Sequence, residues 1–214
     1  MGKRVKMDEI VNCALEAIDK AHKDYHKWSN GEWLWNAPEY FLTVRIAEKI
    51  AKLDKNKFVT MEDNVDYILD EAKAKKSGDI HPDIRADGRF DIVLWWASCE
   101  PRAIIEVKNG VNAYIKIQED ISRVSRTIKD APIGSKIQFG LIAFYTSHQY
   151  KKGYAIERLD EQIHKIFNSA KDGVGEIGKE LKLEGYWQDM IKCDDNINAY
   201  SPVVFLIKKT KFST

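Results

Sequence analysis

Three charged residues interrupt two apolar segments near the middle of the chain. Asp91 lies within GRFDIVLW, and Glu106 and Lys108 lie within IIEVKN. The two segments are spaced as the strands of a β-hairpin, and a charged side chain on a buried strand costs free energy unless it is paired or binds a metal ion. These three residues are therefore the first candidates for a functional site.

The spacing of Glu106 and Lys108 sends both side chains to one face, because side chains alternate between the faces of a strand. Two hairpin registers are open. A turn centred on Cys99 and Glu100 pairs Asp91 with Lys108 and puts Glu106 diagonally opposite. A turn centred one residue earlier pairs Asp91 directly with Glu106. In both registers the three side chains lie within cross-strand reach.

Two carboxylates and an ammonium group in one place suit a particular chemistry. Carboxylates at one point repel each other and do not both stay ionised without a cation. Mg²⁺ supplies positive charge, because it prefers oxygen ligands and keeps several waters. The neighbouring lysine can then orient an attacking water or stabilise charge that builds on a phosphate. The set predicts a metal-dependent site that cleaves phosphodiesters.

The alternative is a solvated sheet face, on which cross-strand ion pairs contribute about 0.2–1 kcal/mol each. The flanking residues favour a functional site instead. Asp91 is followed by IVL, and Glu106 is preceded by AII. Such apolar neighbours are typical of strands in a core rather than of an exposed ribbon.

A further acid comes from the segment that begins near Pro38. At about 100° per residue, the apolar stripe that includes Leu42 and Ile46 falls within roughly 60° of the direction of Glu39. Glu48 points about 180° away and should face water. Glu39 is therefore the acid of this segment that we expect at the site.

The remaining pattern predicts helices at about 7–27, 38–53, 60–75, 112–130, 154–170 and 173–183, and strands at 89–96, 103–108, 137–145 and 202–209. Apolar periodicity identifies the helices, and short apolar runs between Gly, Pro and Asp identify the strands. This order predicts an α/β fold, with a mixed sheet flanked by helices. We expect one domain over 1–214, with N-terminal helices about 7–76 and a core sheet with helices about 84–214.

These features resemble the PD-(D/E)xK nuclease superfamily, which has the restriction-endonuclease-like fold. The resemblance covers roughly residues 38–146 and rests on GRFDIVLW, on IIEVKN after it, and on the helix and core strand that follow. It implies that Asp91 and Glu106 bind Mg²⁺, with Mn²⁺ as a substitute, that Lys108 is the catalytic lysine, and that Glu39 assists this metal or a second one.

The sequence departs from the superfamily pattern at three points. Phe90 precedes Asp91 where many members have proline. A literal Pro-Asp pair ends at Asp83, in a turn-rich loop 23 residues before Glu106, and ranks below Asp91. Gln118 is followed four residues later by Ser122, whereas the recombination-nuclease branch has tyrosine there.

The resemblance implies a Mg²⁺-dependent deoxyribonuclease with a role in restriction, phage defence or repair. Double-strand cutting would then suggest a homodimer, because one such site cuts one strand. The alternative from a different class is a catalytically silent module of the same fold that binds nucleic acid or a protein.

Two cations and a tryptophan-rich segment are candidates for contacts with DNA. Lys116 and Arg123 lie two turns apart on the helix predicted over 112–130, so they could flank a phosphate backbone. The alternative there is a solvated face on which Asp120 pairs with Arg123. The segment SNGEWLWNAP offers either a stacking surface for bases or part of the core.

Bulk properties exclude several classes of protein. The chain has 214 residues, a net charge of +1 and no apolar run of about 18 residues, so we expect neither a membrane span nor a strong overall attraction to nucleic acid. Cys13, Cys99 and Cys193 are odd in number and widely separated. This favours free thiols in a reducing cytoplasm over disulfides or a zinc site.

Overall fold

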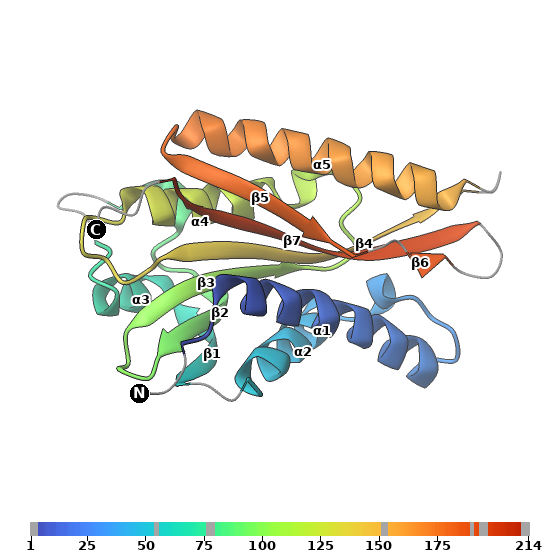
Figure 1. Ribbon diagram of the computed structural model, residues 1–214, viewed down its shortest axis with the longest axis horizontal. Helices are drawn as coiled ribbons and strands as arrows, with labels where there is room; N and C mark the ends of the chain where they lie inside the picture. The colour runs from blue at the N-terminus through green and yellow to red at the C-terminus, as the bar shows by residue number, and fades with distance from the viewer. Residues whose placement is uncertain are drawn as a thin grey trace.

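The computed structural model describes residues 4–53, 56–75, 80–150, 154–188, 191–192 and 197–210. These residues form one mixed β-sheet with helices packed on both of its faces (Figure 1). The α/β class expected from the sequence is therefore confirmed.

The elements are α1 (Met7–Trp28), η1 (Leu34–Asn36), α2 (Glu39–Ala51), β1 (Lys57–Asn64), α3 (Val65–Glu71), η2 (Pro82–Ile84), β2 (Arg89–Trp96), β3 (Pro101–Lys108), η3 (Tyr114–Lys116), α4 (Gln118–Asp130), β4 (Phe139–Gln149), α5 (Ala155–Ile177), β5 (Leu181–Trp187), β6 (Ile191–Lys192) and β7 (Asn198–Lys209). The strand order is β1-β2-β3-β4-β7-β5, with β6 paired to β7. Among the described pairs, β3 and β4 alone run parallel. The chain crosses between them through α4, since parallel neighbours require a long connection.

Alternation along β3 divides its side chains between two hydrophobic layers. Ile105 and Val107 belong to the layer under α1 and α2, whereas Ile104 belongs to the layer under α4 and α5. Glu106 and Lys108 are in phase with Ile104, so they project toward α4. The sheet thus brings both charged groups to one side, as their spacing predicts.

The strands predicted over 89–96 and 103–108 are confirmed as β2 and β3, but the helix predicted over 60–75 is wrong in its first part. Residues up to Asn64 form β1, which pairs with β2 along its length. Asn64, not Thr60, caps α3 by accepting a hydrogen bond from the Tyr67 N–H. The Thr60 hydroxyl instead accepts a hydrogen bond from Trp95 Nε1 across the strand pair.

Two helix boundaries also differ from the prediction. The helix expected from residue 112 begins at Gln118, because the chain first pairs with β4 through the Val111 N–H, which donates to the Tyr145 carbonyl at 3.0 Å, and then forms the separate short helix η3. The two helices expected over 154–170 and 173–183 are the single helix α5, and β5, which was not predicted, follows it. Gly173 does not end the helix. It makes room for Tyr114, whose hydroxyl would lie 2.4 Å from a Cβ at this position.

Gly140 marks a close approach between β4 and α4. A Cβ there would lie 2.3 Å from Cγ1 of the buried Val124. We expect Gly140→Ala to lower the free energy of unfolding by about 1–3 kcal/mol, the usual cost of overpacking a core. Gly175→Ala in α5 is the matched control, because nothing lies within 4 Å of its Cβ. It should raise the free energy of unfolding by about 0.5–1 kcal/mol. Urea unfolding measures both changes, and equal changes would contradict this packing.

His22 of α1 lies in an aromatic cluster on the other face of the sheet. Its ring centroid is 3.8 Å from that of Tyr200 and 5.4 Å from that of Tyr145, and its Nδ1 has no hydrogen-bond partner among the described residues. Burial, together with the nearby His26, lowers the pKa of His22 from 6.5 to about 4.

This lowered pKa predicts a pH-dependent loss of stability. The contribution of the neutral ring is complete above pH 6.5 and is lost as the pH falls toward 4, because the unfolded chain takes up the proton first. The loss amounts to as much as about 3 kcal/mol. Urea unfolding at pH 7 and pH 4.5 should show it in the wild type, and His22→Phe should remove it. The same pH dependence in both proteins would contradict the prediction.

Candidate active site

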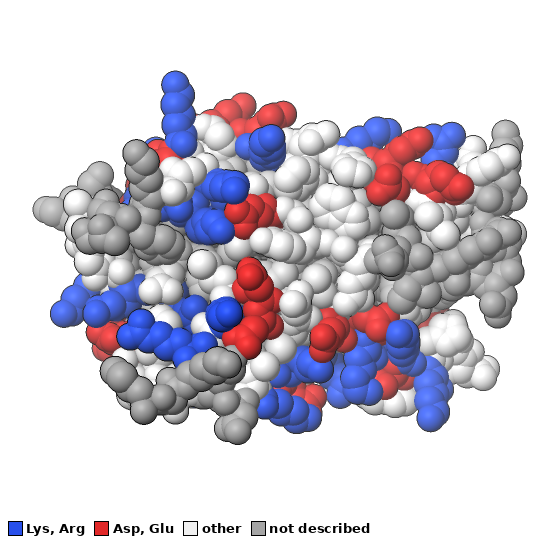
Figure 2. Space-filling model, viewed as in Figure 1, with Lys and Arg blue, Asp and Glu red and all other residues white. Residues whose placement is uncertain are grey.

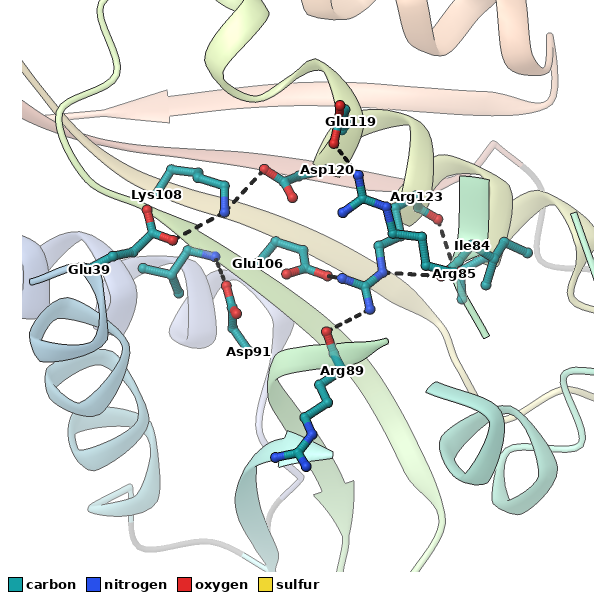
Figure 3. Close-up of polar contacts among 12 residues, drawn as sticks. Glu39, Ile84, Arg85, Arg89, Asp91, Glu106, Lys108, Glu119, Asp120 and Arg123 are labelled. Carbon is teal, nitrogen blue, oxygen red and sulfur yellow. Dashed lines mark hydrogen bonds and ion pairs between the residues drawn. The ribbon is translucent and has the colours of Figure 1, made fainter. Parts of the chain in front are cut away.

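The three candidate residues of the hairpin meet near the start of α4 (Figure 3). The register pairs Ile92 with Ile105 and Val93 with Ile104. Continued by one pair, it sets Asp91 opposite Glu106, so the second of the two registers left open by the sequence is the one found. Asp91 Oδ2 also accepts a hydrogen bond from the Val107 N–H at 2.7 Å.

Lys108 lies between carboxylates from two helices. Its Nζ is 3.2 Å from Glu39 Oε1 and 3.5 Å from Asp120 Oδ2. Burial alone would lower the pKa of Lys108, but the carboxylates of Asp120, Glu39 and Asp91 outweigh it and raise the pKa. Lys108 is therefore an ammonium ion at neutral pH, able to donate hydrogen bonds and to act as a positive charge.

Glu39 joins the site because α2 begins there. Pro38 occupies the N-cap position, and Glu39 is the acidic residue of the first turn. Its Oε2 accepts a hydrogen bond from the Asn109 N–H at 3.1 Å, while Oε1 contacts Lys108. Glu39 thus binds the end of β3 through both the Asn109 backbone and the Lys108 side chain. It lies at the site, as its position on the apolar stripe of the helix predicted.

Glu106 is the most buried acid of the site, with 2% of its surface exposed. Arg123 Nη1 lies 3.0 Å from its Oε1, as an ion pair whose geometry is not that of a hydrogen bond. Burial raises the pKa of Glu106 well above its usual value, Arg123 opposes this rise, and Asp91 and Asp120 add to it. A bound cation would therefore stabilise the ionised form.

Arg123 does not lie on an exposed face, so the position predicted for it was wrong. It is 6% exposed and donates from Nε to the Ile84 carbonyl at 3.2 Å and from Nη2 to the Arg89 carbonyl at 2.6 Å. Its guanidinium also lies over the Phe90 ring. The face of α4 that looked solvated in the sequence is covered by η2 and the start of β2, whose carbonyls bind the arginine.

Lys116 is exposed, as expected, but it lies in η3 rather than on α4. It therefore does not share a helix face with Arg123. A contact between Lys116 and DNA stays a prediction.

Asp120 belongs to this cluster and does not lie on a solvated face of the helix, contrary to what its spacing with Arg123 suggested. It is 7% exposed, and burial raises the pKa of its carboxyl group while Lys108 opposes the rise. Its place three residues before Arg123 puts both on one side of α4. The three-residue spacing of Asp120 and Arg123 indicates that they share one side of a helix. The sequence does not indicate that this side faces the sheet.

Asp83 of the literal Pro-Asp pair lies beside the cluster and is not part of it. Its Oδ2 accepts a hydrogen bond from the Ser122 hydroxyl at 2.6 Å and lies 3.7 Å from Arg126 Nε. It lines a pocket of about 560 Å³ together with Arg85 and Glu119, which form an ion pair. Asp91 therefore remains the better candidate for the site.

The donor set fits Mg²⁺ in its chemistry. Within the part of the chain that the structure describes, no group of three His, Cys, Asp or Glu side chains is arranged to hold a metal ion. Mg²⁺ commonly takes only one or two protein carboxylates and completes its shell with waters and substrate phosphate. Asp91 and Glu106 would supply two such carboxylates, and Glu106 Oε1 would have to exchange its ion pair with Arg123 at 3.0 Å for the metal ion.

The face that carries α1, β5 and α5 shows basic and acidic side chains interleaved (Figure 2). Over β5 and β7, for example, Lys182 and Lys208 both pair with Glu184. Among the described residues of this face, the basic side chains form no continuous band that would attract a nucleic acid.

No protein-family model, curated protein or solved structure matches this chain. Among the described residues, no helix combines the length and the apolar character needed to cross a membrane. The function is accordingly inferred from the geometry of the site.

Proposed function

We propose that this chain is a Mg²⁺-dependent deoxyribonuclease with a restriction-endonuclease-like fold. One observation carries the proposal: Asp91, Glu106 and Lys108 lie together on one side of a hairpin, with charges that influence one another. The strand order supports the fold assignment, because this hairpin continues through α4 into the parallel core strand β4. An isolated ion pair on the surface would not combine a buried Glu106 with pKa values that the neighbouring charges shift.

The residues divide into ligands and orienting groups. Asp91 and Glu106 would hold the Mg²⁺ ion, which when bound would polarise the scissile phosphate and neutralise developing charge. Lys108 donates to the attacking water or to a phosphate oxygen. Because its pKa is raised, Lys108 acts as a charged donor and not as a general base. Glu39 and Asp120 orient the ammonium group from either side.

The experiment that tests this function uses supercoiled plasmid, linear duplex and single-stranded DNA. Each is incubated with the purified protein in Mg²⁺, Mn²⁺ or EDTA. Cleavage in either metal and none in EDTA is expected. Conversion of plasmid to linear product without a nicked intermediate would further support a homodimer, because one site cuts one strand. Absence of cleavage in every condition would overturn the proposal.

A binding module without catalysis is the second candidate, and one observation favours it. Arg123 already neutralises Glu106, so the site is electrostatically satisfied in part without a metal ion. Such a module would bind DNA with a strong dependence on salt and would not cleave it. The same samples distinguish the two functions when binding and cleavage are measured together.

A further inference from the structure

An exposed indole lies beside the end of the catalytic strand. Trp35 of η1 is 43% exposed. Its Cβ would be 3.4 Å from a Cβ placed on Gly110, two residues after Lys108. Gly110 has a φ of +66°, a backbone conformation that suits glycine, and the distance to Trp35 is that of an ordinary van der Waals contact. Trp35 therefore lies beside the backbone that follows the proposed active site.

The segment that carries Trp35 is fixed to this strand end. Asn109 Nδ2 donates to the Leu34 carbonyl at 2.7 Å and to the Ala37 carbonyl at 2.9 Å, on either side of the tryptophan. Asn109 also donates its backbone N–H to Glu39. Asn109 thus positions both the segment that carries the Trp35 indole and the Glu39 carboxylate.

The indole is also supported from behind. Its ring stacks on Trp33, with centroids 4.8 Å apart and planes 20° apart. Trp33 in turn packs edge-on against His22 and Tyr200 of the aromatic cluster. An exposed aromatic ring held in one orientation loses little conformational freedom when a ligand stacks on it.

Resting on the proposed function, we propose that Trp35 is a stacking platform for an unpaired nucleobase next to the scissile phosphate. The charged cluster recognises phosphate, whereas a flat apolar ring recognises the face of a base without regard to sequence. A paired base has both faces covered by its neighbours in the duplex. The preferred substrate is therefore a strand with unpaired bases at the cut, such as single-stranded DNA or a frayed end.

The test measures binding of a fluorescent single-stranded oligonucleotide by anisotropy in Ca²⁺, with gels run to verify that the DNA stays intact. A second oligonucleotide of equal length has abasic sites throughout and so presents phosphates without bases. The variants are Trp35→Leu, which keeps an apolar side chain, and Trp35→Phe, which keeps an aromatic ring. Trp28→Leu is the control, because Trp28 is an exposed tryptophan that packs on Phe41 and Arg45 instead.

Trp35→Leu should weaken binding of the normal strand by about tenfold or more. Trp35→Phe should restore most of this loss, and Trp28→Leu should bind as the wild type does. The abasic strand should bind wild type and Trp35→Leu equally. Equal binding of the normal strand by wild type and Trp35→Leu would overturn the inference.

Two outcomes separate this inference from the proposed function. If the wild type cleaves DNA with Mg²⁺ and Trp35→Leu still binds the normal strand fully, the inference fails and the nuclease stands. If the wild type neither binds nor cleaves any DNA, both fail. Thermal unfolding of each variant identifies any loss of binding that comes from misfolding.

Discussion

Replacing Lys108 with methionine should reduce Mg²⁺-dependent DNA cleavage by about 100- to 1,000-fold, the usual cost of removing one electrostatic group from a transition state. Methionine keeps an unbranched apolar side chain and removes the charge. The effect should appear in the single-turnover rate at saturating DNA, because the ammonium group acts on charge that develops during the reaction.

A lysine outside the cluster provides the control for this prediction. Lys49 of α2 is half-exposed and pairs with Glu16 of α1, so Lys49→Met changes the net charge by the same amount. It should leave the cleavage rate within about twofold, since exposed ion pairs contribute little. Equal rates for Lys108→Met and the wild type would remove Lys108 from the reaction.

Replacing Arg123 with methionine should lower the free energy of unfolding by about 3–5 kcal/mol, because it removes the closest cation that opposes the burial of the Glu106 carboxyl group. The variant also loses the donors to the Ile84 and Arg89 carbonyls. Adding Glu106→Gln should return part of the stability, because a neutral amide does not need the cation that has been lost. Mg²⁺ should stabilise Arg123→Met more than the double variant, since a ligand stabilises only a native state that binds it.

Urea unfolding with and without Mg²⁺ measures these changes. The matched control is Arg126→Met, because Arg126 is one helical turn away, is partly exposed and lies 3.7 Å from the exposed Asp83. It should cost no more than about 1 kcal/mol. If Arg123→Met and Arg126→Met lose equal stability, the buried pair of Arg123 and Glu106 does not stabilise the fold more than a partly exposed ion pair does.

The hairpin could be predicted from the sequence because its signal is local. The apolar runs of β2 and β3 and the two-residue spacing of Glu106 and Lys108 need no information from elsewhere in the chain. β1 was missed because it is an edge strand with polar residues, and its Thr60 and Asp63 imitate a helix cap. Its identity as a strand comes from pairing with β2, which is a tertiary effect.

The acids of β2, β3 and α2 could be predicted as neighbours, whereas the partners on α4 could not. The periodicity of a helix gives its faces, but not which of its polar residues another element will cover. Asp120 and Arg123 looked like a solvated pair. In the fold each has a separate partner on β3, since α4 lies across the strand that carries Glu106 and Lys108.

The most direct test of the site measures Mn²⁺ binding and DNA cleavage on the same samples of wild type and Asp91→Asn. Asparagine keeps the size of the side chain and an oxygen that can accept from the Val107 N–H, so the hairpin should fold unchanged. We predict that the variant loses Mn²⁺ affinity and cleavage together. Wild-type Mn²⁺ affinity and cleavage in Asp91→Asn would contradict the assignment of the metal-dependent site to this hairpin.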